Sequence, residues 1–273
     1  MTRTIAGPTT AGGPAPAATS SWVGRRLRGW VRPVVSLVAG LAIWELVGQY
    51  VVTDRTFFVP FSDAMVRMYE LFASGALVND IRVTAIELVV GYLCAVVIGT
   101  GIGTAMGLST KVRSILIFWV DVFNATPVLA LAPLFILMLG IGLVSKFAFV
   151  TFVAMWTILL NTMQGFLHTD KPSLEMARSF GCSPWQEFKW VRLPYAIPTI
   201  AVGLRVGVGR AVAGVVVGEL FGSTAGLGYR LFASRDAFDT AGIFASIVVF
   251  AVMALIAVNV MGIFERRLSS WRQ

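Results

Sequence analysis

Side chains that could carry out catalysis or bind a metal are few in this 273-residue sequence. It contains one histidine, His168, and two cysteines, Cys94 and Cys182. No His-x-x-x-His pair, no paired-acid motif and no G-x-x-x-x-G-K-[ST] phosphate loop occurs. Without these groups the usual routes to hydrolysis, metal chemistry and nucleotide binding are missing. We therefore expect no catalytic residue, no metal site and no cofactor in this chain, and a membrane enzyme is the weaker alternative.

Several charged residues lie inside apolar segments. They are Glu45, Glu87, Asp121, Arg205, Arg210 and Glu219. Ionisable groups at membrane depth are costly and usually either pair or act on a ligand. Arg205 is close to the end of its segment, where a long side chain can reach the interface. Arg210 lies deeper, and two interpretations stay open: an ion pair with Glu219 or Glu87, or attraction of an anion that crosses the membrane.

The elements that must position these groups are long apolar helices. Hydrophobic residues make up 57% of the chain and charged residues 13%, against about 25% charged residues in soluble domains. Six segments are long and apolar enough to span a bilayer, at residues 33–52, 86–108, 115–139, 147–166, 197–221 and 241–264.

Residues 62–74 form a shorter amphipathic helix at the interface or against other helices. Residues 1–24, rich in Thr, Ala, Gly and Pro, are predicted to be a disordered tail. The chain is thus predicted to be an all-α membrane domain at 25–273.

The distribution of positive charge predicts the orientation. The net charge is +8, which in a soluble protein would suggest a nucleic-acid partner, and none is expected here. With the N-terminus in the cytoplasm, fourteen of the 22 Lys and Arg residues face inside, six face outside and two lie in the fifth span. This bias predicts that both termini are cytoplasmic. It also predicts that the polar segment 170–194 is cytoplasmic.

Glycines at a spacing of four recur in two spans. They are Gly99, Gly103 and Gly107 in the second span, and the pairs Gly203 with Gly207 and Gly214 with Gly218 in the fifth. Small residues at this spacing let helices approach closely. Packing inside the chain is the favoured interpretation, and a sliding or dimer surface is the alternative.

The first half of segment 170–194 has the signals of a short helix. Asp170 can cap a helix that has Pro172 in its first turn. Gly181 fits the left-handed position at the helix end. Between them, residues at a spacing of three form a narrow apolar edge, namely Leu174, Ala177 and Phe180. Residues 170–181 are therefore predicted to form one short helix that ends at a glycine.

A second short helix is predicted directly after this glycine. Ser183 and Gln186 form a capping box, and Pro184 suits the first helical position. The second apolar edge consists of Trp185, Phe188 and Val191. Pro194 disfavours helical backbone at Leu193 and should end the unit. Helices this short are marginal in water, so the hairpin must dock either on its own bundle or on another protein.

The hairpin resembles the signature loop of ABC-importer permeases. The family pattern is Glu-Ala-Ala, three residues, Gly, nine residues, Ile, one residue, Leu-Pro. In this chain it reads Glu175, Met176, Ala177, Gly181, Val191, Leu193 and Pro194. Met176 and Val191 depart from it by apolar exchanges, and the bulkier Met176 alters the local fit. Segments 126–142, 158–165, 203–220 and 226–231 also look like the nitrate, sulfonate and taurine subgroup of these permeases.

The resemblance implies a type I ABC-importer permease fold with cytoplasmic coupling helices, in a bacterial cytoplasmic membrane. It implies three kinds of partner: two separate ATPase subunits that bind ATP and Mg, an extracytoplasmic binding protein, and a second copy of the permease. The ATPase-coupling residues implied are Glu175, Ala177, Arg178, Ser179, Phe180 and Gly181. The subgroup implies transport of a small anion such as a sulfonate, nitrate or carboxylate. A neutral pyrimidine precursor is the alternative, as is a purely structural or receptor subunit.

Five polar or charged residues and one proline within the spans are candidates for a translocation pathway. They are Asn124, Thr126, Pro127, Asn161, Arg210 and Glu219. Asn124, Thr126 and Asn161 could offer hydrogen bonds along a path. Pro127 weakens the third span and frees backbone carbonyls, which a cavity could use.

Overall fold

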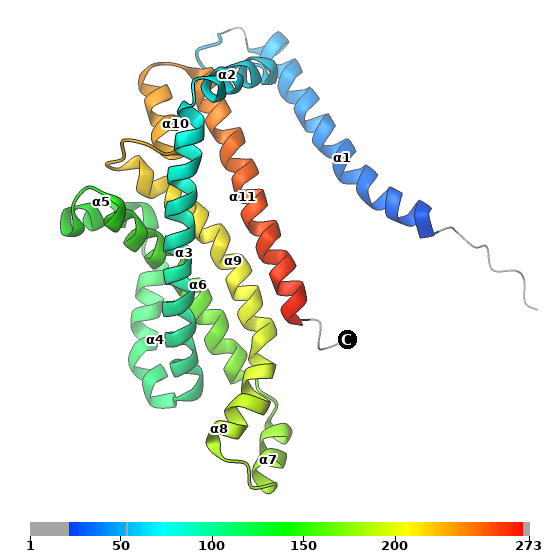
Figure 1. Ribbon diagram of the computed structural model, residues 1–273, viewed down its shortest axis with the longest axis vertical. Coiled ribbons are helices and arrows are strands. Elements are labelled where there is room, and N and C mark those ends of the chain that lie inside the picture. Colours follow the sequence, from blue (N-terminus) through cyan, green and yellow to red (C-terminus); the bar gives the residue numbers. More distant parts are fainter. Residues whose placement is uncertain (1–21, 53, 270–273) are drawn as a thin grey trace, which may run out of the picture.

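A computed structural model describes residues 22–52 and 54–269, and all its regular elements within these ranges are helices (Figure 1). The long ones are α1 (Trp22–Leu46) with its π-helical extension η1 (Val47–Val51), α3 (Ala76–Leu108), α6 (Leu143–Leu167), α9 (Leu193–Leu220) and α11 (Thr240–Ser269). The shorter ones are α2 (Phe61–Ala73), α4 (Thr110–Ala125), α5 (Val128–Leu139), α7 (Lys171–Ser179), α8 (Pro184–Glu187) with η2 (Phe188–Arg192), and α10 (Leu227–Asp236). The predicted tail lies outside the described residues, except for its last three, which begin α1.

Five of the described helices are long and apolar enough to cross a membrane, and the bent pair α4–α5 makes a sixth if it counts as one span. The all-α membrane fold is therefore confirmed. The amphipathic segment predicted at 62–74 is α2, which packs through Ala64 and Leu71.

The third span is not the single helix expected from residues 115–139. Helices α4 and α5 meet at an angle of 108°. Thr126 and Pro127 between them have extended backbone, with ψ angles of 133° and 112°. Pro127 lacks an N–H and its ring excludes the helical conformation at the preceding residue, so the chain breaks there. A second proline, Pro133, lies inside α5.

The second span begins earlier than expected. The sequence indicated residue 86, but α3 begins at Ala76. The first turns of α3 carry Asp80 and Thr84, which look like loop residues, yet both side chains are buried. Their hydrogen bonds are made within the bundle, so polarity in this segment marks an internal contact.

The centre of the bundle is α6, packed between α3 and α9. A Cβ added at Gly103 of α3 would lie 2.6 Å from the Leu159 carbonyl oxygen of α6. One added at Gly203 of α9 would lie 2.5 Å from the Asn161 Cβ. These glycines are buried, so internal packing is the correct interpretation for them.

Helix α1 stands apart from the bundle in Figure 1 and joins it near its C-terminal end. There the Trp44 indole N–H donates to the Val59 carbonyl over 3.0 Å. The Trp44 ring contacts Phe58, Phe61 and Phe244. Most of the described apolar side chains of α1 are exposed.

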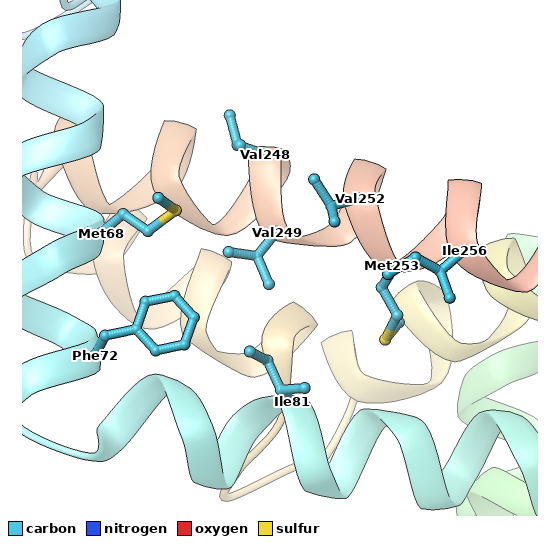
Figure 2. Close-up of a pocket in the computed structure, with 8 residues that line it drawn as sticks. All are labelled: Met68, Phe72, Ile81, Val248, Val249, Val252, Met253 and Ile256. Carbon is cyan, nitrogen blue, oxygen red and sulfur yellow. The ribbon is translucent and has the colours of Figure 1, made fainter.

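An apolar pocket of about 370 Å³ lies between α2, α3 and α11 (Figure 2). Met68 and Phe72 come from α2, Ile81 from α3, and the remaining lining residues from α11. No polar side chain lines it. The pocket therefore offers no group to bind a charged solute and is no candidate for an anion pathway.

Candidate functional site

The hairpin at 170–194 lies at the end of the molecule opposite α2 and α10 (Figure 1). Its first helix, α7, begins as the sequence predicts. The Asp170 carboxylate accepts hydrogen bonds from the Ser173 amide over 3.0 Å and from the Ser173 hydroxyl over 2.6 Å. The Ser173 hydroxyl and amide lower the pKa of Asp170. The cap therefore holds above the ordinary carboxyl pKa and is lost as the pH falls through the lowered value.

Helix α7 ends in a Schellman motif. The Cys182 amide donates to the Ala177 carbonyl over 3.1 Å, and the Gly181 amide to the Arg178 carbonyl over 2.9 Å. Gly181 has φ +74°, the left-handed conformation expected at this position. A Cβ at Gly181 would meet no atom within 4 Å. Backbone angle, not lack of space within the chain, therefore requires glycine here.

The second helix begins with the predicted capping box. The Gln186 amide donates to the Ser183 hydroxyl over 3.3 Å, and the Ser183 amide donates to the Gln186 side-chain oxygen over 2.7 Å. Its predicted end at Pro194 is wrong. Leu193 is helical, with φ −64° and ψ −47°, and the chain passes through η2 directly into α9. The widened π-helical turn accommodates the proline ring, which would clash with a carbonyl in a regular α-helix.

The Glu187 carboxylate binds two arginines and so holds the two halves of the hairpin together, a contact that the sequence did not predict and that we call the clasp. Glu187 is buried, and its Oε2 accepts from Arg178 Nε over 3.0 Å. Its Oε1 accepts from Arg192 Nε over 2.7 Å. The clasp joins α7 to η2, so Arg178 already has an acidic partner within its own chain. The sequence spacing does not indicate this contact, because Arg178 and Arg192 are nine and five residues away from Glu187.

Aromatic and hydroxyl contacts attach the hairpin to the bundle. The Phe188 ring stacks on Phe166 of α6, with centroids 5.9 Å apart, and on Trp185, with centroids 5.4 Å apart. The Ser173 hydroxyl lies 3.3 Å from the Tyr195 hydroxyl of α9. The hairpin is therefore held on both sides of its turn.

The tip of the hairpin is uncovered by the rest of the chain. Phe180 is 81% exposed, Trp185 68% and Met176 61%. Phe180 is thus exposed, whereas Ala177, which the sequence grouped with it on one apolar edge, is buried. Among the six residues expected to contact an ATPase, five are exposed, namely Glu175, Arg178, Ser179, Phe180 and Gly181. The sixth, Ala177, is buried.

The intramembrane charges are arranged differently from the expected ion pair. Glu87 binds Lys146 over 2.8 Å, and Glu219 accepts a hydrogen bond from the Thr84 hydroxyl over 2.5 Å. Arg205 pairs with Glu265 over 3.2 Å. Arg210 is exposed and bonds to neither carboxylate. The proposed Arg210 pair is therefore wrong, because both carboxylates lie on the buried side of the helices.

The remaining pathway candidates do not converge on one site. Asn124 and Pro127 are exposed near the α4–α5 bend, and the Thr126 hydroxyl donates to the Val122 carbonyl over 2.8 Å. Asn161 is half-buried between α6 and α9 and donates to the Thr157 carbonyl over 2.8 Å. Among the described residues, no cluster of three or more His, Cys, Asp or Glu side chains could hold a metal.

Comparison with known proteins identifies the family that carries this hairpin. Residues 91–270 match the model of the "Binding-protein-dependent transport system inner membrane component". The chain belongs to this family. It is the permease subunit of an ABC importer, a multi-pass protein of the bacterial inner membrane, and its role is transport rather than catalysis. Importers of this kind work with an ATPase and a binding protein.

Similar relatives cover nearly the whole chain. A Bacillus subtilis (strain 168) permease named for aliphatic sulfonates, SsuC, is 31% identical over 91% of this chain and 90% of its own. The Escherichia coli (strain K12) taurine transport system permease TauC is 27% identical over 86% and 88%. The formylaminopyrimidine transport permease ThiX of Halalkalibacterium halodurans is 25% identical over 89% and 96%.

A solved structure shares the fold. A chain from inward-facing conformations of the MetNI methionine ABC transporter superposes with a TM-score of 0.63 at 19% identity, covering 71% of this chain and 96% of that one. At this level of identity the likeness concerns the architecture alone.

Proposed function

We propose that the hairpin 170–194 is the coupling element that inserts into a groove of a separate ATPase subunit. The support is the exposed aromatic tip, because large apolar side chains dominate the energy of protein interfaces when they fill a partner pocket. A loop that packed only on its own bundle would bury Phe180 and Trp185, and in this chain both are exposed.

The six expected coupling residues then divide by role. Glu175, Ser179 and Phe180 lie on the exposed surface and would touch the partner. Arg178 would contact it while still bound to Glu187, which fixes its direction. Ala177 is buried and spaces α7 against the second half of the hairpin. Gly181 supplies the turn.

The experiment that tests this role compares two exposed phenylalanines. Phe180→Ala should weaken binding of the ATPase by about 2 kcal/mol, the loss typical of an interface anchor, and should reduce uptake in proportion. Phe57 is 78% exposed near α2, at the opposite end of the bundle, so Phe57→Ala is the matched control. Co-purification of the ATPase from detergent measures both. Equal loss in the two variants, or none in either, would exclude the hairpin as the docking element.

The substrate that we propose is a small anion, such as a sulfonate, nitrate or carboxylate. Arg210 supports this, because it lies on the exposed face of α9 together with Val206, Gly209 and Ala213. The sulfonate and taurine names of two relatives agree with an anion. The name of the formylaminopyrimidine relative favours the second candidate, a neutral pyrimidine precursor.

The assembly that we propose is a homodimer of permeases with two ATPases, which bind ATP and Mg. Both termini and the hairpin face the cytoplasm, as the distribution of Lys and Arg favours, and α2 and α10 face outward toward a binding protein. The exposed face of α9 would line a path between the two copies. Nucleotide and binding protein would each shift the same equilibrium between inward-open and outward-open states.

A further inference from the structure

Helix α10 has an unusual start, because its first amides are capped by side chains of other helices. The Gly226 amide donates to Asp80 Oδ1 over 2.9 Å, and the Leu227 amide to Thr84 Oγ1 over 2.9 Å. The Gly228 amide donates to Glu219 Oε2. We call Asp80, Thr84, Glu219 and these three amides the cap network. Two carboxylates thus lie at the positive end of α10, where a helix favours negative charge.

The cap network joins three helices at one end of the bundle. Asp80 and Thr84 are one turn apart on α3, and Glu219 is at the end of α9. The Thr84 hydroxyl donates to Glu219 Oε1 over 2.5 Å, and Arg230 Nε donates to Asp80 Oδ2 over 2.7 Å. Glu219 is 1% exposed. The position of α10 therefore depends on buried charge-assisted hydrogen bonds, which are the stronger kind.

The glycines of this connection make room for the carboxylate. A Cβ at Gly226 would overlap the Glu219 carboxyl group, and one at Gly228 would lie 2.9 Å from the Glu219 Cβ. Gly226 also has φ +119°. The segment is thus built around Glu219 and not merely next to it.

Lys146 gives Glu219 a second possible partner. Lys146 and Gly218, the residue before Glu219, line the same small cavity between α6 and α9. Lys146 now binds Glu87 Oε1 over 2.8 Å, whereas Glu87 Oε2 is buried without a hydrogen-bond partner. The Lys146 ammonium is therefore bound to Glu87 and lies close to the end of α9 that carries Glu219. If Glu219 lost its hydrogen bond from the α10 backbone, Lys146 could neutralise its charge. Without such a partner, the free-energy cost of a buried, ionised carboxylate would be prohibitive.

We propose that the cap network is a latch that holds the α9–α10 connection closed at the extracytoplasmic end, with Glu219 as its positioning residue. When this end opens, the hydrogen bonds to the α10 amides would break, and the Glu219 carboxylate would form an ion pair with Lys146 instead. The inference rests on the proposed transport cycle, because only alternating access requires this end to open. A contact made in one of two states sets their ratio, so weakening the latch must favour the open state.

Ser223 provides the measurement, because it lies in the latched connection and its hydroxyl is buried. In the assembled importer in intact cells, Ser223→Cys is labelled from outside with a membrane-impermeant thiosulfonate, and the labelling of the parent chain is subtracted. Adding Glu219→Gln should speed labelling at least about tenfold, as expected for one lost hydrogen bond to a charged group. The double change Glu87→Gln with Lys146→Gln should slow it, because released Glu219 then has no cation.

Two controls separate the latch from general damage. Glu265→Gln makes the same chemical change to the pair that joins Arg205, in the middle of α9, to the C-terminal part of α11, and it should leave the labelling rate unchanged. Thr84→Val removes one hydroxyl and should speed labelling, whereas Thr84→Ser should restore the parent rate. If Glu219→Gln does not accumulate in the membrane, the comparison of Thr84→Val with Thr84→Ser tests the latch instead.

Parent-like labelling in both Glu219→Gln and Thr84→Val would overturn the latch. If labelling of Ser223→Cys is not slower in the variant that carries both Glu87→Gln and Lys146→Gln, Lys146 is not the partner of Glu219 in the open state. If Ser223→Cys reacts only in inside-out vesicles, the proposed orientation fails instead. Loss of the ATPase from the purified parent complex would count against the proposed coupling role, and not against the latch.

Discussion

At the tip of the hairpin, Gly181 adopts φ +74°, and a side chain there would point into open space. An L-residue with a Cβ is strained in this backbone conformation by roughly 1–2 kcal/mol, whereas asparagine visits it more readily. The sequence indicated this angle because a cap, a glycine and a second cap follow one another. Local signals of this kind operate within a few residues and need no knowledge of the fold.

Two substitutions at Gly181 can separate the effect of backbone conformation from the effect of side-chain size. Gly181→Ala should disturb the Schellman turn and reduce ATPase-coupled uptake, and Gly181→Asn should retain more of it because asparagine tolerates the left-handed conformation. Membrane insertion should be unchanged in both, since the turn lies outside the spans. Uptake by reconstituted complexes gives the comparison. If alanine transported as well as glycine and asparagine worse, backbone angle would not be the reason for glycine.

Residues that act across long sequence distances escaped prediction. Glu87 and Lys146 are 59 residues apart, and Thr84 and Glu219 are 135 apart. Sequence reasoning found Glu87 and Glu219 costly in a membrane but could not tell which side of each helix was buried. An ion pair with one of them was one of two interpretations left open for Arg210, and it is wrong because Arg210 lies on the exposed face of α9.

At the scale of the helices, hydropathy located all six apolar segments, since their length follows from bilayer thickness. It missed the start of α3, where buried polar residues look like a loop. Pro127 was predicted to weaken the third span, but not to break it into two helices at 108°. The predicted end of the hairpin at Pro194 was also wrong, because the conformational rule for residues before proline does not take a π-helical turn into account. The start of α3 was missed because tertiary contacts bury its polar residues, whereas the other two errors concern how far a proline disturbs the local backbone.

Helix α3 contains two glycines that make a matched pair for testing the packing against α6. A Cβ at Gly103 would lie 2.6 Å from the Leu159 carbonyl oxygen, and one at Gly101 would meet nothing within 4 Å. Gly103→Val should therefore destabilise the bundle by about 1–3 kcal/mol or more through overpacking. Gly101→Val should change stability little. Thermal unfolding in detergent measures both, and equal melting temperatures would exclude the close approach.

At the scale of the whole molecule, the exposed face of α9 gains its proposed meaning only when a second copy stands opposite. Two Arg210 guanidinium groups would then flank one path and raise the local concentration of anions. Arg210→Gln should lower uptake of an anionic substrate at least about tenfold, and Arg210→Lys should retain part of it. Uptake of a neutral substrate should be insensitive to both changes. Radiolabelled sulfonate and pyrimidine precursors in proteoliposomes distinguish the two, and identical rates for all variants would move the anion path elsewhere.

The unbroken helix from Pro184 to Leu220 has a mechanical consequence. Its 37 residues correspond to about 55 Å at the usual helical rise, without a loop or swivel between the hairpin and Glu219. If the hairpin binds the ATPase as proposed, a displacement of its second helix would be transmitted to the other end of α9 without an intervening loop. One continuous helical segment would then connect the proposed docking element directly to Glu219 of the proposed latch.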